Sequence, residues 1–266
     1  MTWNPLKKNY LTQRPTFAPP LLSYTEDNQL DLVVQRLIYV EDTIRKLTKE
    51  MKKYIGALEN LDRADQRLST NLINCGLAQN NDEYRKIVEE YSSVAVQVGK
   101  NIHEMTGLCY KTFIEPLKKF RGEFAIIAAA VAKREELATT WRYLYNRVKK
   151  LQEKKDRTAS HIAKLERERR AEEAAAKELK TVHAQLLKEL PMFLEKRLEY
   201  INPSIHAMIM IQLNYYGHAT QLYTLLMPVQ YSECNASSTT LPEEEYQRTI
   251  NTELNRLRSL TIVKDS

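Results

Sequence analysis

The stretch QLDLVVQRLIYVEDTIRKLTKEMKKYIGALENL, residues 29–61, decides the fold class. Large apolar residues recur in it at steps of three and four, and this stripe continues to residue 72. Its members are Leu30, Val34, Leu37, Val40, Ile44, Leu47, Met51, Tyr54, Leu58, Leu61, Leu68 and Leu72. A mean step of about 3.5 residues is the period of a coiled-coil seam. Ser23-Tyr24-Thr25-Glu26 has the form of a capping box, so a helix is expected to begin there and to end at a turn near Gly76.

Two further long helices are predicted downstream. One runs from about residue 82 to 155 with an apolar step near 3.6, and Pro116 is expected to kink it. The next begins near residue 158 and ends before Pro228, and Pro191 and Pro203 are expected to bend it. Helices of about 50, 74 and 70 residues would be roughly 75–110 Å long, too long for a compact bundle. The prediction is therefore an all-α fold, an elongated antiparallel coiled coil of three long kinked helices.

The chain divides into three parts by composition. Residues 1–20 hold four of the nine prolines and are mildly basic, so they are not expected to form a long helix. Residues 21–232 form the predicted helical domain. Residues 233–266 are a linker and a short helix, with a capping box at Thr240 and Glu243 and an apolar stripe of Tyr246, Ile250, Leu254 and Leu257.

Positive charge is concentrated in one segment. The whole chain has a formal charge of +6, whereas residues 133–170 alone carry thirteen basic and six acidic residues. This segment spans the end of the second helix, the connection and the start of the third. A basic surface of this kind binds polyanions, either acidic lipid headgroups or nucleic acid. Beyond Tyr145 the segment has no aromatic residue for base stacking, which favours a flat anionic surface such as a membrane over nucleic acid. A solvated charged face is the alternative.

The sequence contains no pattern typical of an enzyme or a metal site. There is no glycine-rich phosphate loop, no nucleophile elbow and no zinc-binding spacing of cysteine and histidine. We therefore expect no catalytic residues, no cofactor and no metal. The three cysteines are an odd number without a CxxC pair, which favours a reducing cytosol.

The apolar stripes in the middle of the second and third helices are wide enough to cover more than one chain. We expect part of this surface to be a dimer interface. The candidates are Phe113, Phe120, Phe124, Leu198, Ile205 and Met208.

Several segments resemble one family. Residues 112–120 (TFIEPLKKF) are similar to the centre of the second helix in BAR-domain proteins of the amphiphysin and bridging-integrator type. Residues 132–151 resemble the basic end of that helix, and residues 187–193 (LKELPMF) with Arg197, Tyr200 and Pro203 resemble the third helix. The opening Met1-Thr2-Trp3 and the ending at residues 259–263 (SLTIV) resemble the short members without an SH3 domain.

This resemblance implies a crescent-shaped dimer, homodimeric or heterodimeric with another BAR protein. It would sense or stabilise membrane curvature and link anionic phospholipid membrane to cortical actin during endocytosis, cytokinesis or related remodelling. Carried over by position, Lys133, Arg134, Arg142, Arg147, Lys149 and Lys150 lie on the basic concave stretch, and Lys154, Lys155 and Arg157 lie at the arm tip. The charge block adds Lys164 and Arg167 to this membrane-binding set.

The expected location is peripheral, at the cytoplasmic side of a membrane and its cortical actin. Actin-associated proteins or a small GTPase are the further partners considered, and no nucleic acid is expected. The alternative function is a dimeric coiled-coil adaptor that binds a protein such as a small GTPase and no lipid. Prolines 5 and 15 leave about nine residues for an amino-terminal helix, so we expect residues 1–20 to contribute little to membrane insertion.

Overall fold

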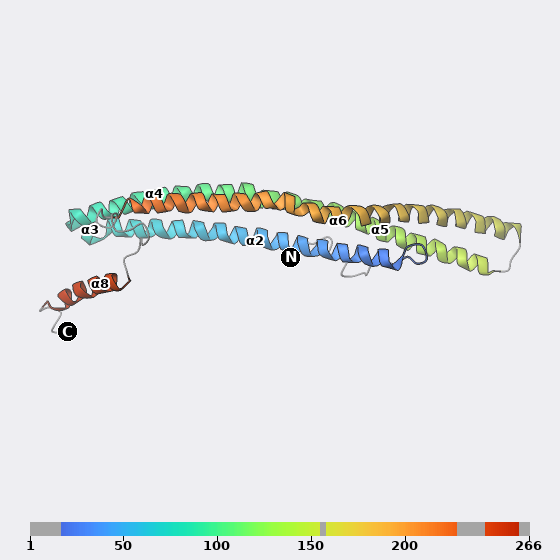
Figure 1. The fold of residues 1–266 in the computed structure, drawn as a ribbon, viewed down its shortest axis with the longest axis horizontal. Helices are drawn as coiled ribbons and strands as arrows, with labels where there is room; N and C mark the ends of the chain where they lie inside the picture. The colour runs from blue at the N-terminus through green and yellow to red at the C-terminus, as the bar shows by residue number, and fades with distance from the viewer. Residues whose placement is uncertain (1–16, 155–157, 228–242, 261–266) are drawn as a thin grey trace. The chain divides into compact units, whose positions relative to one another are not determined.

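The computed structural model describes residues 17–154, 158–227 and 243–260 (Figure 1). Its helices are α2 (Tyr24–Asn74), α3 (Gly76–Asn80), α4 (Asp82–Cys109), the π-helical segment η1 (Tyr110–Ile114), α5 (Glu115–Glu153), α6 (Ala159–Thr224) and α8 (Glu243–Arg258). The described residues contain no strand, which confirms the all-α prediction. Their contacts form two compact units, residues 1–65 with 99–216 and residues 66–98 with 217–266.

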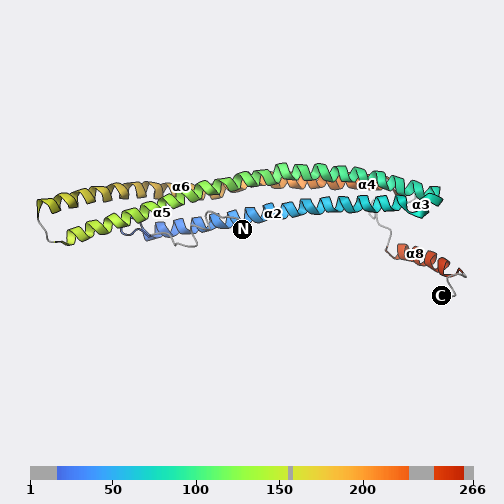
Figure 2. The same ribbon diagram turned by 180° about the vertical axis from the view of Figure 1, so that it is seen from behind.

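In the first unit the chain runs through three long helical segments: α2, then the end of α4 with η1 and α5, and then α6. In two opposite views α5 and α6 lie side by side, and α2 accompanies them over part of their length (Figure 1 and Figure 2). The Tyr200 hydroxyl donates to the Pro116 carbonyl at 3.2 Å, and Trp141 donates to Glu172, so residue numbers fall along α6 as they rise along α5. These two helices are therefore antiparallel, as the sequence predicted.

The seam of α2 follows a strict seven-residue repeat. Leu30, Leu37, Ile44, Met51 and Leu58 are all buried and lie seven positions apart. This spacing confirms the predicted coiled-coil period.

The second row of the α2 seam differs from the prediction. It holds Asp27, Val34, Glu41 and Thr48, all buried, whereas the predicted Leu47 and Leu61 are 40% and 49% exposed. The apolar stripe is wider than the seam because Leu47 and Leu61 face away from the single chain's core.

The predicted irregularity at Pro116 takes the form of a π-helical segment. Pro116 is the second residue of α5, and the five residues before this helix, Tyr110–Ile114, are wound as η1. The Glu115 N–H donates to the Tyr110 carbonyl, a bond across five residues instead of four. A π turn widens the helix where the proline ring would crowd the carbonyl one turn earlier. By contrast, α6 continues through Pro191 and Pro203 without ending.

The helix ends confirm several signals in the sequence. The Ser23 N–H donates to the Glu26 side chain at 3.2 Å, which is half of the predicted capping box. The Thr158 hydroxyl accepts from the His161 N–H at 3.3 Å and caps α6.

In the second unit, Asn81 accepts from the Tyr84 N–H at 2.9 Å and caps α4. Gly76, predicted as a turn, begins the short helix α3 instead. In α8 the predicted apolar residues Ile250, Leu254 and Leu257 are exposed, while Thr240 lies outside the described residues.

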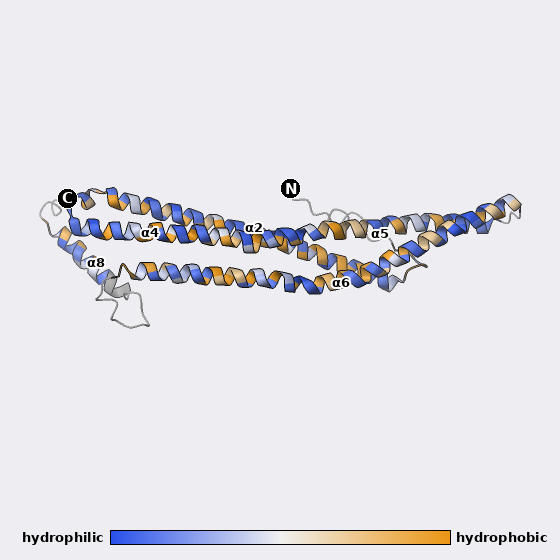
Figure 3. Ribbon diagram, turned by 90° about the horizontal axis from the view of Figure 1, so that it is seen from above, coloured by the Kyte–Doolittle hydropathy of each residue, from blue (hydrophilic) through white to orange (hydrophobic). Residues whose placement is uncertain are grey.

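Hydrophilic and hydrophobic residues are interleaved along every helix (Figure 3). This pattern is that of amphipathic helices, in which one face can pack against a neighbour while the other lies in solvent. In α8 every side chain from residue 247 to 258 is exposed. None of the described helices combines the length and the apolar character needed to cross a bilayer.

Candidate membrane-binding surface

The basic segment of the sequence forms a two-helix hairpin, residues 133–153 of α5 and 159–179 of α6. Three polar contacts set its register. Lys133 Nζ lies 3.6 Å from a Glu178 carboxylate oxygen, Trp141 Nε1 donates to Glu172 Oε1 at 2.7 Å, and Arg147 donates to Glu168 Oε1 at 2.8 Å. At the far end, a His161 ring nitrogen lies 3.0 Å from the Leu151 carbonyl oxygen.

The interior of the hairpin is narrow and mostly apolar, with Arg134 and Glu168 as its buried charged residues. Ala138, Trp141, Val148 and Leu179 are buried, and the Tyr145 ring stacks on Trp141 with 5.2 Å between ring centroids. With so little width available, most other side chains of the hairpin must face solvent. The narrow interior is thus the physical reason for the high charge content of this segment.

Five basic side chains of the hairpin are exposed and form no ion pair with any described residue: Arg142, Lys149, Lys150, Lys154 and Lys164. Arg167 is also exposed and lies 3.9 Å from Glu168. Cations without a partner are available to an external polyanion. These six residues are the candidate membrane-binding surface.

Two other predicted membrane residues are partly engaged inside the protein. Lys133 is exposed but pairs with Glu178. The Arg147 guanidinium pairs with the buried Glu168 and lies over the Tyr143 ring, 5.5 Å from its centroid. Their charge is partly neutralised, so they offer less to a membrane than the unpaired cations do.

The structure does not gather all the basic residues on one flank. Lys133 and Arg142 are nine positions apart, and about 100° per residue turns the second by roughly half a turn from the first. Arg142 and Lys149 are seven apart and share a flank. The positive surface therefore wraps around the hairpin, with Lys149 and Lys164 at about the same level of the antiparallel pair.

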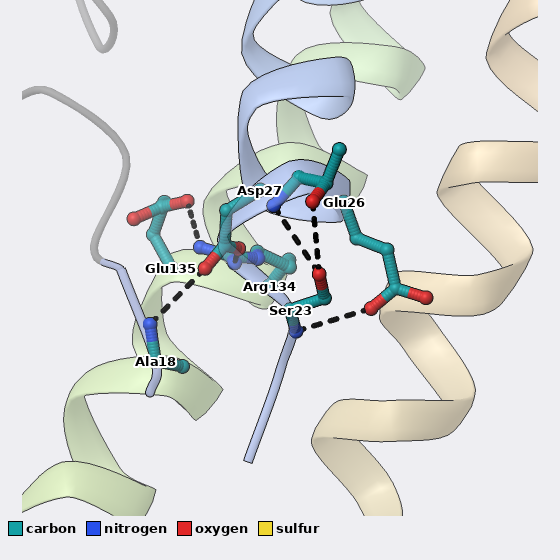
Figure 4. A network of polar contacts seen from close by, with 7 residues as sticks. Ala18, Ser23, Glu26, Asp27, Arg134 and Glu135 are labelled. Carbon is teal, nitrogen blue, oxygen red and sulfur yellow. Dashed lines mark hydrogen bonds and ion pairs between the residues drawn. The ribbon is translucent and has the colours of Figure 1, made fainter. Parts of the chain in front are cut away.

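The assignment of Arg134 to the membrane surface is wrong. Its side chain is fully buried and pairs with the equally buried Asp27 at the start of α2, and its other guanidinium nitrogen donates to Glu135 Oε1 at 2.7 Å (Figure 4). A buried guanidinium that already holds two carboxylates cannot reach lipid headgroups. Two more predicted residues, Lys155 and Arg157, lie outside the described residues.

The predicted dimer residues fall into two groups. Phe113, Phe120 and Phe124 are buried in the core of the single chain, and Phe120 stacks on Phe193 with 5.4 Å between ring centroids. Residues already buried in one chain offer little surface to a second one. Leu198 and Ile205 of α6 are exposed and Met208 is half-buried, so these three stay candidates.

Sequence reasoning missed the role of Asp27. The signal that could have revealed it is Arg134 itself, which interrupts an otherwise apolar stripe on the second helix. A cation at a seam position needs a buried anion opposite it. Asp27 occupies the matching seam position of α2, three residues before Leu30.

Comparisons with known proteins agree with this architecture. The family model described as BAR domain matches residues 23–230. The chain is 28% identical over 265 residues to the bridging integrator 3 homolog of Xenopus laevis, with all of both chains covered. It is 22% identical over 243 residues to the regulator of cytoskeleton and endocytosis RVS161 of Candida albicans, covering 88% of this chain and 90% of that one.

Among solved structures, a BAR protein from Galdieria sulphuraria superimposes with a TM-score of 0.63 at 15% identity. The match covers 80% of this chain and all of the other.

Proposed function

Because the chain belongs to the BAR domain family, we propose that it is a dimeric, non-enzymatic scaffold that binds anionic membrane through the hairpin and stabilises membrane curvature. The observation that carries the proposal is the set of exposed cations on this hairpin that pair with no described residue, namely Arg142, Lys149, Lys150, Lys154 and Lys164. They lie on a thin two-helix hairpin whose exposed side chains are mostly charged, with Tyr143 and Ile162 as its exposed large apolar residues. This surface is suited to an electrostatic contact.

The expected binding energy is sufficient for this role. Each Lys or Arg near an anionic leaflet contributes about 1 kcal/mol at physiological salt. If four such side chains per chain reach the headgroups, a dimer gains on the order of 8 kcal/mol before entropic losses. A monomer gains half of that, so dimerisation decides whether binding is strong.

Apolar residues of the first unit support self-association. Leu198, Ile205, Ile209 and Leu213 of α6 are exposed, as are Leu47 and Leu61 of α2. Water-exposed leucine and isoleucine at this density are typical of a surface that another chain covers. We take this surface as the dimer interface, formed with a second copy or with another BAR protein.

A role at the cytoskeleton and in endocytosis is part of the proposal. It rests on the likeness to the Candida albicans relative, whose name carries both processes. The protein would act peripherally, on the cytoplasmic side of a membrane next to cortical actin.

The test reverses the unpaired cations. Lys149, Lys150, Lys154 and Lys164 are changed together to Glu, and the variant is sedimented with phosphatidylserine-rich and with neutral vesicles. We expect wild-type protein to pellet with the acidic vesicles only and the variant to remain in solution. Circular dichroism should be unchanged, because none of these side chains is buried.

A charge-matched control carries the same substitution at Lys46, Lys49, Lys52 and Lys188, all exposed and outside the hairpin. Its vesicle binding should stay close to wild type. If the hairpin variant is folded and still pellets at the wild-type level, the hairpin is a solvated charged face. If wild-type protein binds no vesicles at all, the coiled-coil adaptor that binds a protein partner is the correct function.

A further inference from the structure

The short segment before α2 is packed against the hairpin. Ala18 is fully buried and Leu22 nearly so, and both belong to one apolar cluster with Ala138 and Trp141 of α5 and Leu179 of α6. Residues 17–22 therefore touch both helices of the hairpin as well as leading into α2.

Polar contacts lock this segment in place. The Ala18 N–H donates to Asp27 Oδ2 at 3.2 Å, while Asp27 Oδ1 pairs with Arg134 (Figure 4). The Leu22 N–H donates to the Ala18 carbonyl at 2.9 Å, which closes the turn. A single carboxylate thus holds both the segment and the hairpin.

The position of the segment along the hairpin matters. At its amino-terminal end, α2 is held to α5 through Asp27 and Arg134. Trp141 is seven residues further along α5, about 10 Å, and it is the Ala18–Leu22 turn that packs on it there. Residues 17–22 therefore act as a third packed segment beside α5 and α6 for about two helical turns beyond Arg134.

We propose that residues 17–22 are a brace that stiffens the base of the hairpin. With the brace closed, Trp141 is 1% exposed and the hairpin is fixed to α2 on both sides of Arg134. With the brace open, the Asp27–Arg134 pair still holds the hairpin to α2, but the packing of Ala18 and Leu22 in the Trp141 cluster is lost. The brace would thereby set the angular freedom of the basic surface, a consequence that rests on the proposed function.

The brace can open without unfolding the rest of the unit. Its own contacts are few: the apolar side chains of Ala18, Leu21 and Leu22 in the cluster, one N–H to Asp27, and the stacking of Phe17 on Tyr24 at 4.9 Å between ring centroids. The cluster that holds Ala18 and Leu22 contains no residue of the α2 seam from Leu30 onward. Elements with few buried contacts open locally, at a lower free energy than global unfolding.

The test introduces a charge into the brace alone. In a Trp3→Phe background, Trp141 is the sole tryptophan and reports on its own exposure. Ala18→Glu places a carboxylate at a fully buried position, which the segment can relieve by leaving the hairpin. Thr25→Glu is the matched control, since Thr25 is exposed seven residues away and gains the same charge.

We expect Ala18→Glu to shift Trp141 emission to the red. It should also speed amide exchange at Leu22 and over residues 138–148 by about tenfold or more, with exchange at residues 37–58 unchanged. Thr25→Glu should change none of these. Leu22→Ala, a milder change, should give the same pattern at smaller amplitude.

Unchanged Trp141 emission and unchanged exchange over residues 138–148 in Ala18→Glu would overturn the brace. So would loss of protection throughout α2, because the segment would then be part of the main core. All measurements are made without membrane, so they stand or fall separately from the lipid-binding proposal.

Discussion

Asp27 of α2 and Arg134 of α5, 107 positions apart in the sequence, form an ion pair in which both side chains are fully buried. Desolvating two charges costs several kcal/mol per ion, and their attraction offsets this only when further hydrogen bonds satisfy them. Here Asp27 also accepts from the Ala18 N–H, and Arg134 also donates to Glu135. The pair therefore serves to specify how α2, the brace and α5 align.

Removing one partner of this pair should be strongly destabilising. Asp27→Ala leaves the Arg134 guanidinium buried without its carboxylate, and the expected loss in the free energy of unfolding is about 3–5 kcal/mol. The double change Asp27→Leu with Arg134→Met should recover most of the loss, because neither buried charge remains. Urea unfolding followed by circular dichroism measures both. A double variant no more stable than Asp27→Ala would contradict this account.

His183 should make the protein less stable in acid. Its ring is buried, and neither ring nitrogen has a hydrogen-bond partner among the described residues. Burial, and next the neighbouring Arg134, lower the pKa of His183 below its usual value of 6.5, against an opposing effect of Asp27, Glu26 and Glu135. The unfolded chain then binds the proton more readily. The stability that depends on neutral His183 is fully present above pH 6.5 and is lost as the pH drops below it. The free energy of unfolding then decreases by at most about 1.4 kcal/mol per pH unit.

The measurement is urea unfolding at pH 7.5 and pH 5.5 for wild type and His183→Met. The substitution fills the site with an apolar side chain of similar size and removes the titrating group. We expect a smaller difference between the two pH values in the variant. An equal difference in both proteins would assign the acid sensitivity to other groups.

Ile205→Asp should convert the protein to a monomer. Ile205 lies on the exposed apolar face of α6, 37% exposed in the single chain, so an aspartate is tolerated there until a second chain buries it. Sedimentation equilibrium at micromolar concentration reports the mass. Ile126→Asp, at a position of α5 that is 66% exposed, is the control and should leave the mass unchanged. A wild-type protein that is monomeric at this concentration would refute the interface.

Two amino-terminal deletions should differ sharply. Removing residues 1–16 leaves the brace intact, so stability should be unchanged and vesicle binding within a few-fold of wild type. Removing residues 1–22 takes away Ala18 and Leu22 and uncovers Trp141, so stability should fall. Thermal unfolding and vesicle sedimentation separate the two. A complete loss of vesicle binding on removing residues 1–16 would show that these residues insert into lipid as a helix.

Vesicle binding should depend steeply on salt. The proposed contact is electrostatic and at the surface, and the Debye length shortens from about 8 Å at physiological salt to about 3 Å at 1 M. Sedimentation with acidic vesicles over this range should show binding lost at high salt. Binding that persists at 1 M would point to apolar insertion as the main contribution.

The long helices could be predicted from the sequence because their cause is local. Apolar residues at steps of three and four, a capping box at Ser23 and scarce glycine specify amphipathic helices whatever surrounds them. The start of α6 at Ala159 and the disturbance before Pro116 are local in the same sense. The concentration of charge in the hairpin was also visible, since charge is a property of composition.

The tertiary structure decided which residues of each helix face the core. Leu47 and Leu61 look like core residues in the sequence, and Arg134 looks like a surface cation, yet the first two are exposed and the last is buried. Because the apolar stripe is wider than one seam, the sequence does not show which of two neighbouring positions faces the core. The register is settled by partners far away in the chain, such as Asp27 for Arg134, whose pairing no local pattern encodes.

The sequence by itself therefore determined that this protein is a set of long amphipathic helices with a basic hairpin. The reason is that apolar periodicity and charge content are local properties, set by residues only a few positions apart. Only the tertiary structure decided which exposed cations pair with no described residue, which are held by carboxylates, and that residues 17–22 pack against the hairpin. Those outcomes depend on desolvation and on contacts between segments more than a hundred residues apart, which exist only once the helices have packed.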